Sequence, residues 1–107
     1  MAEVQWDRDF ALEQAADDEE LLAELIELFH DSSANDLAAI KESAASADAA
    51  AMGDAAHSIK GAAASLGIEG IRSVASDLEK DGRDGDLEGA KSYIPLLEEL
   101  LEKLKNI

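Results

Sequence analysis

The chain has 107 residues, with 25 acidic residues against 9 basic ones and a formal net charge of -16. This excess of acid leaves no basic surface for nucleic-acid phosphates or anionic membranes, and the lack of cysteine excludes disulfides and thiolate metal sites. Apolar residues make up 47% of the chain but aromatic residues only 4%, which favours closely packed helices and predicts an all-α protein.

The acidic residues are unevenly distributed. Residues 1–56 contain 15 acidic and 2 basic residues, whereas residues 57–107 contain 10 acidic and 7 basic ones. The second half of the chain can therefore present a surface that is not uniformly acidic. No apolar run approaches the ~20 residues of a membrane span, and the first residues do not resemble a signal peptide, so we expect a cytoplasmic protein.

The first half of the chain predicts a short helix followed by a long one. Asp7 or Asp9 can cap the short helix. Asp17 is the expected N-cap of a long helix over residues 18–46, with acidic residues in its first turn. Because a polar stretch interrupts the leucine pattern, this helix could be kinked near residue 32.

The second half predicts three further helices. Asp48 caps a helix over residues 49–66, and Gly67 supplies the left-handed residue that ends it. An amphipathic pattern over residues 71–78 marks the next helix.

The last helix follows an expected loop at Gly82–Gly85. Asp86 is its N-cap, and apolar residues continue at helical spacing over residues 87–104. Pro95 interrupts this pattern and predicts a kink or a break, because proline lacks the backbone donor and crowds the preceding turn.

These elements predict an antiparallel up-and-down four-helix bundle with a short N-terminal helix. We expect a single domain over residues 1–107, with the bundle core at about 18–105, and a monomer.

The segment from Gly53 to Gly67 contains the residues that can perform chemistry. On a helical wheel, Ile59 and Leu66 lie on the side predicted to be buried, whereas His57 lies on the opposite side. The outer face around His57 consists of Gly53, Lys60, Gly61 and Ala64.

This outer face suits the attachment of a phosphoryl group. A neutral imidazole is a nucleophile near pH 7, and Lys60, one turn after His57, can contact an anion bound to the ring. Gly61 costs about 1 kcal/mol relative to alanine inside a helix, which favours a bare surface that another protein approaches closely. The sequence contains no nucleotide-binding loop, so we expect a phosphocarrier without catalytic turnover of its own.

The residues from His57 to Gly67 resemble the signature of histidine-containing phosphotransfer (HPt) domains of two-component phosphorelays. The shared pattern is histidine, any residue, an aliphatic residue, lysine, glycine, small residues, an aliphatic residue and glycine. The resemblance implies a four-helix bundle that relays a phosphoryl group between the aspartates of receiver domains, which are its expected partners. It implies no cofactor or metal for the chain itself, because Mg²⁺ belongs to the receiver.

The resemblance also implies a role for individual residues. His57 would be the phosphoryl acceptor, through Nε2, and Lys60 would stabilise the phosphoryl oxygens. The receiver would dock on Gly53, Ser58, Gly61 and Ala64, and Gly67 would end the helix. Chemotaxis kinases of the family have a further histidine where this chain has Ser76, although Glu79 is present.

Other interpretations remain open at this point. The chain could be a helical adaptor that has lost phosphotransfer, or the phosphoryl-accepting domain of a larger kinase. His30 lacks the lysine and glycine context and is interpreted as an ordinary surface histidine. Asp54 and His57 could in principle hold a metal ion, but Lys60 opposes a cation there.

Overall fold

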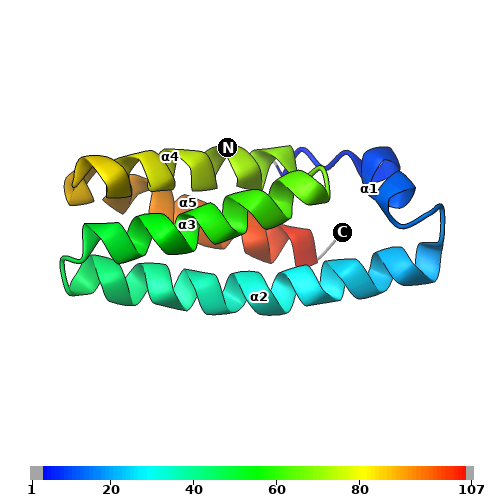
Figure 1. Ribbon diagram of the computed structural model, residues 1–107, viewed down its shortest axis with the longest axis horizontal. Helices are drawn as coiled ribbons and strands as arrows, with labels where there is room; N and C mark the ends of the chain where they lie inside the picture. The colour runs from blue at the N-terminus through cyan, green and yellow to red at the C-terminus, as the bar shows by residue number, and fades with distance from the viewer. Residues whose placement is uncertain (1–3, 106–107) are drawn as a thin grey trace.

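The computed structural model describes residues 4–105, and all elements within this range are helices (Figure 1). They are α1 (Arg8–Gln14), α2 (Glu19–Ala45), α3 (Ala49–Ser65), α4 (Glu69–Asp84) and α5 (Leu87–Lys105). The prediction of an all-α protein is confirmed. Among the described residues, no helix is long and apolar enough to cross a membrane.

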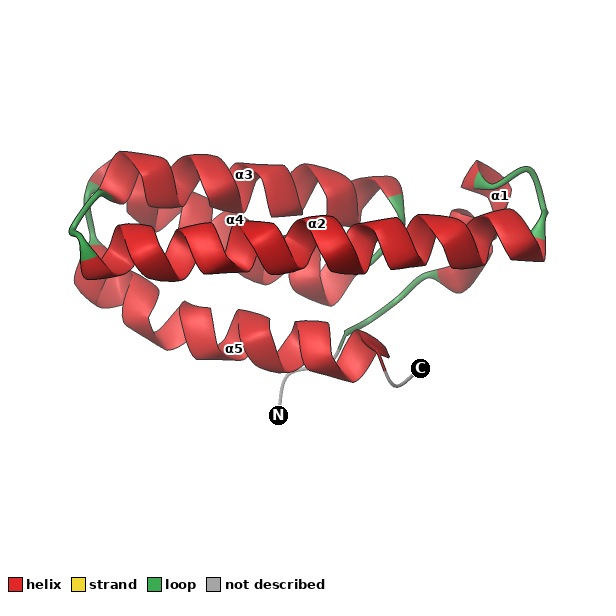
Figure 2. Ribbon diagram, turned by 90° about the horizontal axis from the view of Figure 1, so that it is seen from below, coloured by secondary structure: helices red, strands yellow, loops and turns green. Residues whose placement is uncertain are grey.

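The four long helices lie lengthwise in a body of 42 × 25 × 20 Å. Consecutive long helices run in opposite directions, α3 returning along α2 and α5 along α4 (Figure 1). Helix α3 packs most extensively on α4, and α5 meets both α4 and α2 (Figure 2). Along this α3–α4 contact lie His57 and Lys60 of α3 and Glu79 of α4.

Aspartates cap α1, α2, α3 and α5, whereas α4 follows Ile68 and has no side-chain cap. Carboxylates of Asp7, Asp48 and Asp86 accept hydrogen bonds from backbone N–H groups in the first turns of α1, α3 and α5. For α2, the prediction of Asp17 as the cap is wrong by one residue. Asp17 has a left-handed backbone (φ 60°), whereas Asp18 is extended and accepts from two N–H groups of the first turn.

Helix α2 is continuous through the polar stretch near residue 32. The buried hydroxyl of Ser33 donates to the carbonyl of Phe29 at 2.5 Å, so this polar side chain is satisfied within the helix itself.

The loop expected before α5 is wrong, and of the kink or break expected at Pro95, the break is absent. The residues expected to form a loop at Gly82–Gly85 belong mostly to α4, which continues to Asp84 and ends at left-handed Gly85 (φ 72°). Helix α5 runs without a break through Pro95. Because Pro95 and Lys91 are both exposed, water can satisfy the Lys91 carbonyl that loses its helical donor.

The core lies between the long helices and holds one face of α3. Met52, Ile59 and Ala63 of α3 are fully buried together with Ile71 and Leu78 of α4. The predicted buried side of α3 is therefore confirmed, and the opposite side of this helix faces away from the core.

The segment before α1 packs against the turn between α3 and α4. The indole N–H of Trp6 donates to the Leu66 carbonyl at 3.0 Å. The N–H of Asp7 donates to the Gly67 carbonyl, and the N–H of Gly70 donates to the Val4 carbonyl, both at 2.8 Å. These bonds tie the start of the described chain to the end of α3.

Candidate functional site

His57 lies in the middle of α3 on the face away from the core. Its side chain is 60% exposed, while the neighbouring Ala56 and Ile59 are fully buried. This is the placement that the helical wheel predicts. The ring is nevertheless held on one side, because its Nδ1 lies 2.8 Å from Oε2 of Glu79 on α4.

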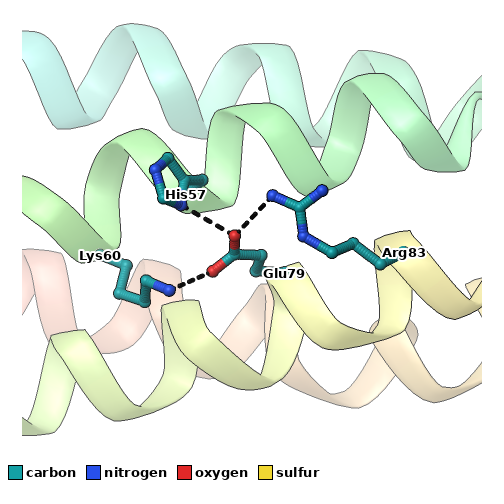
Figure 3. A network of polar contacts seen from close by, with 4 residues as sticks. All are labelled: His57, Lys60, Glu79 and Arg83. Carbon is teal, nitrogen blue, oxygen red and sulfur yellow. Dashed lines mark hydrogen bonds and ion pairs between the residues drawn. The ribbon is translucent and has the colours of Figure 1, made fainter.

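Glu79 is the centre of a network that joins α3 to α4 (Figure 3). Its side chain is only 9% exposed. One carboxylate oxygen, Oε1, forms an ion pair with Lys60 of α3. The other, Oε2, meets both His57 and the guanidinium of Arg83, each at 2.8 Å. A buried carboxylate is thus paired with two cations and one imidazole, as burial of a charge requires.

The cations keep Glu79 ionised. Hydrogen bonds from Lys60, and next from Arg83, lower the pKa of the Glu79 carboxyl from 4.5 to about 2, against burial, which acts to raise it. The hydrogen bond from His57 lowers this pKa further in the same direction. At neutral pH the group facing the imidazole is therefore a carboxylate.

The carboxylate determines which nitrogen of His57 carries the proton when the ring is neutral. An ionised carboxylate can only accept hydrogen bonds, so Nδ1 must carry a proton to donate one. In the neutral ring, the lone pair then lies on Nε2. The second ring nitrogen points away from Glu79 in Figure 3. When the ring is neutral, the site therefore presents a lone pair on Nε2 of an exposed ring.

Two positive side chains flank the imidazole. Lys60 is half-buried, with a side chain 32% exposed, and Arg83 is more exposed. With Glu79 they line a shallow hollow between α3 and α4. The hollow is also lined by Lys80 and Asp84, so three cations and two anions give it a net positive charge in a strongly acidic chain. Such a charge suits an incoming phosphoryl group.

The outer face of α3 beyond His57 has little side-chain bulk. Ser58, Gly61 and Ala64 are all exposed, and a Cβ atom added at Gly61 would meet no atom within 4 Å. Gly67 has φ 69° and follows the C-cap of α3, which confirms the predicted left-handed end.

The prediction that Gly53 belongs to this exposed face is wrong. Gly53 is buried, because α4 approaches α3 there and Gly82 lies directly opposite. A residue so covered cannot contact a receiver. The wheel places Gly53 near His57 by angle alone and carries no information about where the neighbouring helix lies.

Arg83 is a site residue that the sequence pattern does not indicate, because the two glycines around it predict a loop. The spacing of Glu79 and Arg83, four residues apart, is the signal that could have found it, since such pairs meet on a helix.

Ser76 lines the same hollow. Asp54 is exposed, and the described residues contain no group of three or more potential metal ligands. His30 lies on α2, where Lys105 of α5 is its cationic neighbour.

The family model of the Hpt domain matches residues 24–107. No curated protein matches the chain. Among solved structures, the chain is similar to histidine-containing phosphotransfer protein B (HptB) from Pseudomonas aeruginosa PAO1. The TM-score is 0.86 at 23% identity, over 94% of this chain and 87% of that one. At this identity, the structural likeness shows a shared fold.

Proposed function

The chain belongs to the Hpt domain family, and we propose that His57 is the residue through which it performs histidine phosphotransfer in a phosphorelay. The observation that carries this assignment is the hydrogen bond from His57 Nδ1 to Glu79. It holds the proton on one ring nitrogen and leaves a lone pair on the other, which is exposed.

The transfer step follows from this protonation state. The lone pair of His57 Nε2 attacks the phosphorus of a receiver aspartyl phosphate in line with the leaving oxygen. The N–P bond forms while the P–O bond breaks, and its electron pair leaves on the receiver's carboxylate. No proton has to be removed, because Nε2 carries none. Nδ1 keeps its proton, and the positive charge that develops on the ring faces the Glu79 carboxylate.

The return step is the reverse of the first. A carboxylate oxygen of a second receiver attacks the phosphorus, the N–P bond breaks, and Nε2 regains its lone pair. The same contact between Nδ1 and Glu79 serves both directions, which suits a carrier that gains and loses the group in turn.

Lys60 is proposed to stabilise the phosphoryl oxygens. Its ammonium group lies one turn after His57 and is held by Glu79 on the same side of α3. A phosphoryl group on His57 would offer it new oxygen acceptors, and charge-assisted contacts of this kind are stronger than neutral ones. Arg83, held by the same carboxylate, adds a second positive charge beside the ring.

The receiver is proposed to dock on the exposed face made by Ser58, Gly61 and Ala64. Bare backbone lets a partner's phosphoaspartate approach the ring closely, as in-line transfer requires. We expect the receiver to supply Mg²⁺, and the chain to act as a monomeric carrier without turnover of its own. An antiparallel up-and-down four-helix bundle formed by α2–α5 is our interpretation of the helix packing.

The test is the transfer of label from a ³²P-phosphorylated receiver domain. The wild-type protein should acquire an acid-labile, alkali-stable label, and His57→Gln should acquire none. His30→Gln is the matched control, since it removes the other histidine of the chain and should be labelled like the wild type. Labelling of a folded His57→Gln protein would overturn the assignment.

A further inference from the structure

Helices α3 and α4 approach each other closely where Gly53 and Gly82 face. A Cβ atom added at Gly82 would lie 2.6 Å from the Gly53 Cα, 2.7 Å from the Gly53 nitrogen and 2.8 Å from the Ala49 carbonyl oxygen. All three are backbone atoms, which cannot rotate away as the end of a side chain can. A side chain at position 82 would therefore force the two helices apart.

The two glycines differ in the space available for a side chain. A Cβ atom added at Gly53 would lie 3.5 Å from the Glu79 carbonyl oxygen and from the Gly82 Cα, and 3.6 Å from the Arg83 nitrogen. These are ordinary van der Waals distances. The contact thus depends on the absence of a side chain at 82 but has room for one methyl group at 53.

This contact lies one turn from the functional network on both helices. His57 follows Gly53 by four residues on α3, and Glu79 precedes Gly82 by three residues on α4. The helices run in opposite directions, so the His57–Glu79 hydrogen bond and the glycine contact are neighbouring levels of one interface. Glu79 of α4 reaches across that interface to both His57 and Lys60 of α3.

We propose that the Gly53–Gly82 contact is a positioning element that sets the α3–α4 separation at which Glu79 holds the His57 ring with Nδ1 protonated. Relief of the clash at position 82 needs a helix displacement of about 1 Å, which would lengthen a 2.8 Å bond beyond hydrogen-bonding distance. The importance of the Gly53–Gly82 contact for phosphoryl transfer rests on the proposed role of His57. The effect of this contact on the His57–Glu79 hydrogen bond does not depend on that role.

The experiment measures the imidazole ¹⁵N shifts of His57 at a pH where the ring is neutral, in the full chain without any phosphoryl donor. In the wild type, Nδ1 should carry the proton. In Gly82→Ala this tautomer should be lost as the main species, and the shifts should approach those of Glu79→Ala, in which the carboxylate is absent. Gly53→Ala should keep the wild-type pattern, because its methyl group fits.

A second variant adds bulk to the same contact from α3. Gly53→Val places additional carbons against α4 and should also lose the Nδ1-protonated form, so the proposal does not depend on Gly82→Ala being folded. Circular dichroism identifies the folded variants. A folded Gly82→Ala or Gly53→Val protein with the wild-type tautomer would overturn the proposal, as would loss of that tautomer in Gly53→Ala.

The experiment separates positioning from simple stability and from phosphotransfer. A merely structural contact would lower the unfolding temperature of Gly82→Ala and leave the His57 tautomer unchanged. Failure of the proposed function would appear as labelling of His57→Gln, which does not enter this measurement.

Discussion

His57 and Glu79 are joined across the α3–α4 interface by a hydrogen bond of 2.8 Å from the imidazole Nδ1 to the carboxylate Oε2. The exposed residue of the pair is the proposed nucleophile, and the buried residue controls which nitrogen of the ring is free. The reactive group of an open helix face is thus prepared by a carboxylate that belongs to a different helix.

The first prediction concerns pH. The pKa of Glu79 is lowered from 4.5 to about 2 in the folded protein, so its ionised form stabilises the fold at pH values above 4.5. This contribution should be lost as the pH falls from about 4.5 towards 2, because the folded state then resists protonation that the unfolded chain accepts. The free energies of unfolding of the wild type and Glu79→Gln, measured with urea, should therefore differ at pH 7 and converge near pH 2.

Glu88→Gln is the control for this series. Its side chain is 84% exposed, and an exposed ion pair contributes little to stability, so its unfolding midpoint should follow that of the wild type at each pH. A difference between the wild type and Glu79→Gln that stays constant from pH 7 to pH 2 would contradict the prediction.

Lys60→Ala should slow phosphoryl transfer to and from His57 by roughly tenfold or more, because a hydrogen bond to a charged group contributes ~1.5–3 kcal/mol. Quenched-flow measurement with a phosphorylated receiver gives the rate. Lys91→Ala removes an exposed lysine of α5 that pairs with Glu88 and should transfer at the wild-type rate. Equal rates for both variants would remove Lys60 from the mechanism.

Gly61→Leu should weaken receiver binding by roughly tenfold or more, since a side chain that clashes in a tight contact costs about 1–3 kcal/mol. The chain itself should fold normally, because a Cβ atom at this position meets nothing within 4 Å. Calorimetric titration with a receiver measures the affinity. Ser92→Leu adds the same side chain to an exposed position of α5 and should leave the affinity unchanged. Undiminished affinity of Gly61→Leu would move the docking surface elsewhere.

Pro95→Ala should stabilise the protein by about 1–3 kcal/mol. Proline is ~3 kcal/mol less favourable than alanine inside a helix, and its rigidity in the unfolded chain offsets part of that cost. Position 95 is exposed and α5 is continuous around it, so alanine restores a backbone donor without disturbing the core. Ser92→Ala, in the same helix, is the control and should stabilise the protein by only about 0.5 kcal/mol. A decrease in the urea midpoint of Pro95→Ala would mean that the proline stabilises α5.

The features that the sequence predicted well are those determined within a single helix. Apolar spacing placed Ile59 inside and His57 outside, and the aspartate caps follow from local hydrogen bonding. These patterns need no knowledge of the neighbouring elements.

The features that it missed depend on contacts between helices. Gly53 was placed on the exposed face because its angle on α3 resembles that of His57, but the approach of α4 buries it. Arg83 was assigned to a loop because two glycines surround it, yet the close contact at Gly82 and the pairing with Glu79 keep this segment helical. Glycine marks both turns and close packing, and only the tertiary structure distinguishes them.

The bonds that tie the first described residues to the end of α3 make the folding unit larger than the family match. That match begins at residue 24, but Val4 is buried in the main core and Trp6 donates to the Leu66 carbonyl. A protein shortened to the matched region would lose these partners and the backbone bridge between Trp6 and Ile68, whose side chain is fully buried. A shortened form of the chain for expression or transplantation should therefore keep Val4 and Trp6, which lie before the start of the family match.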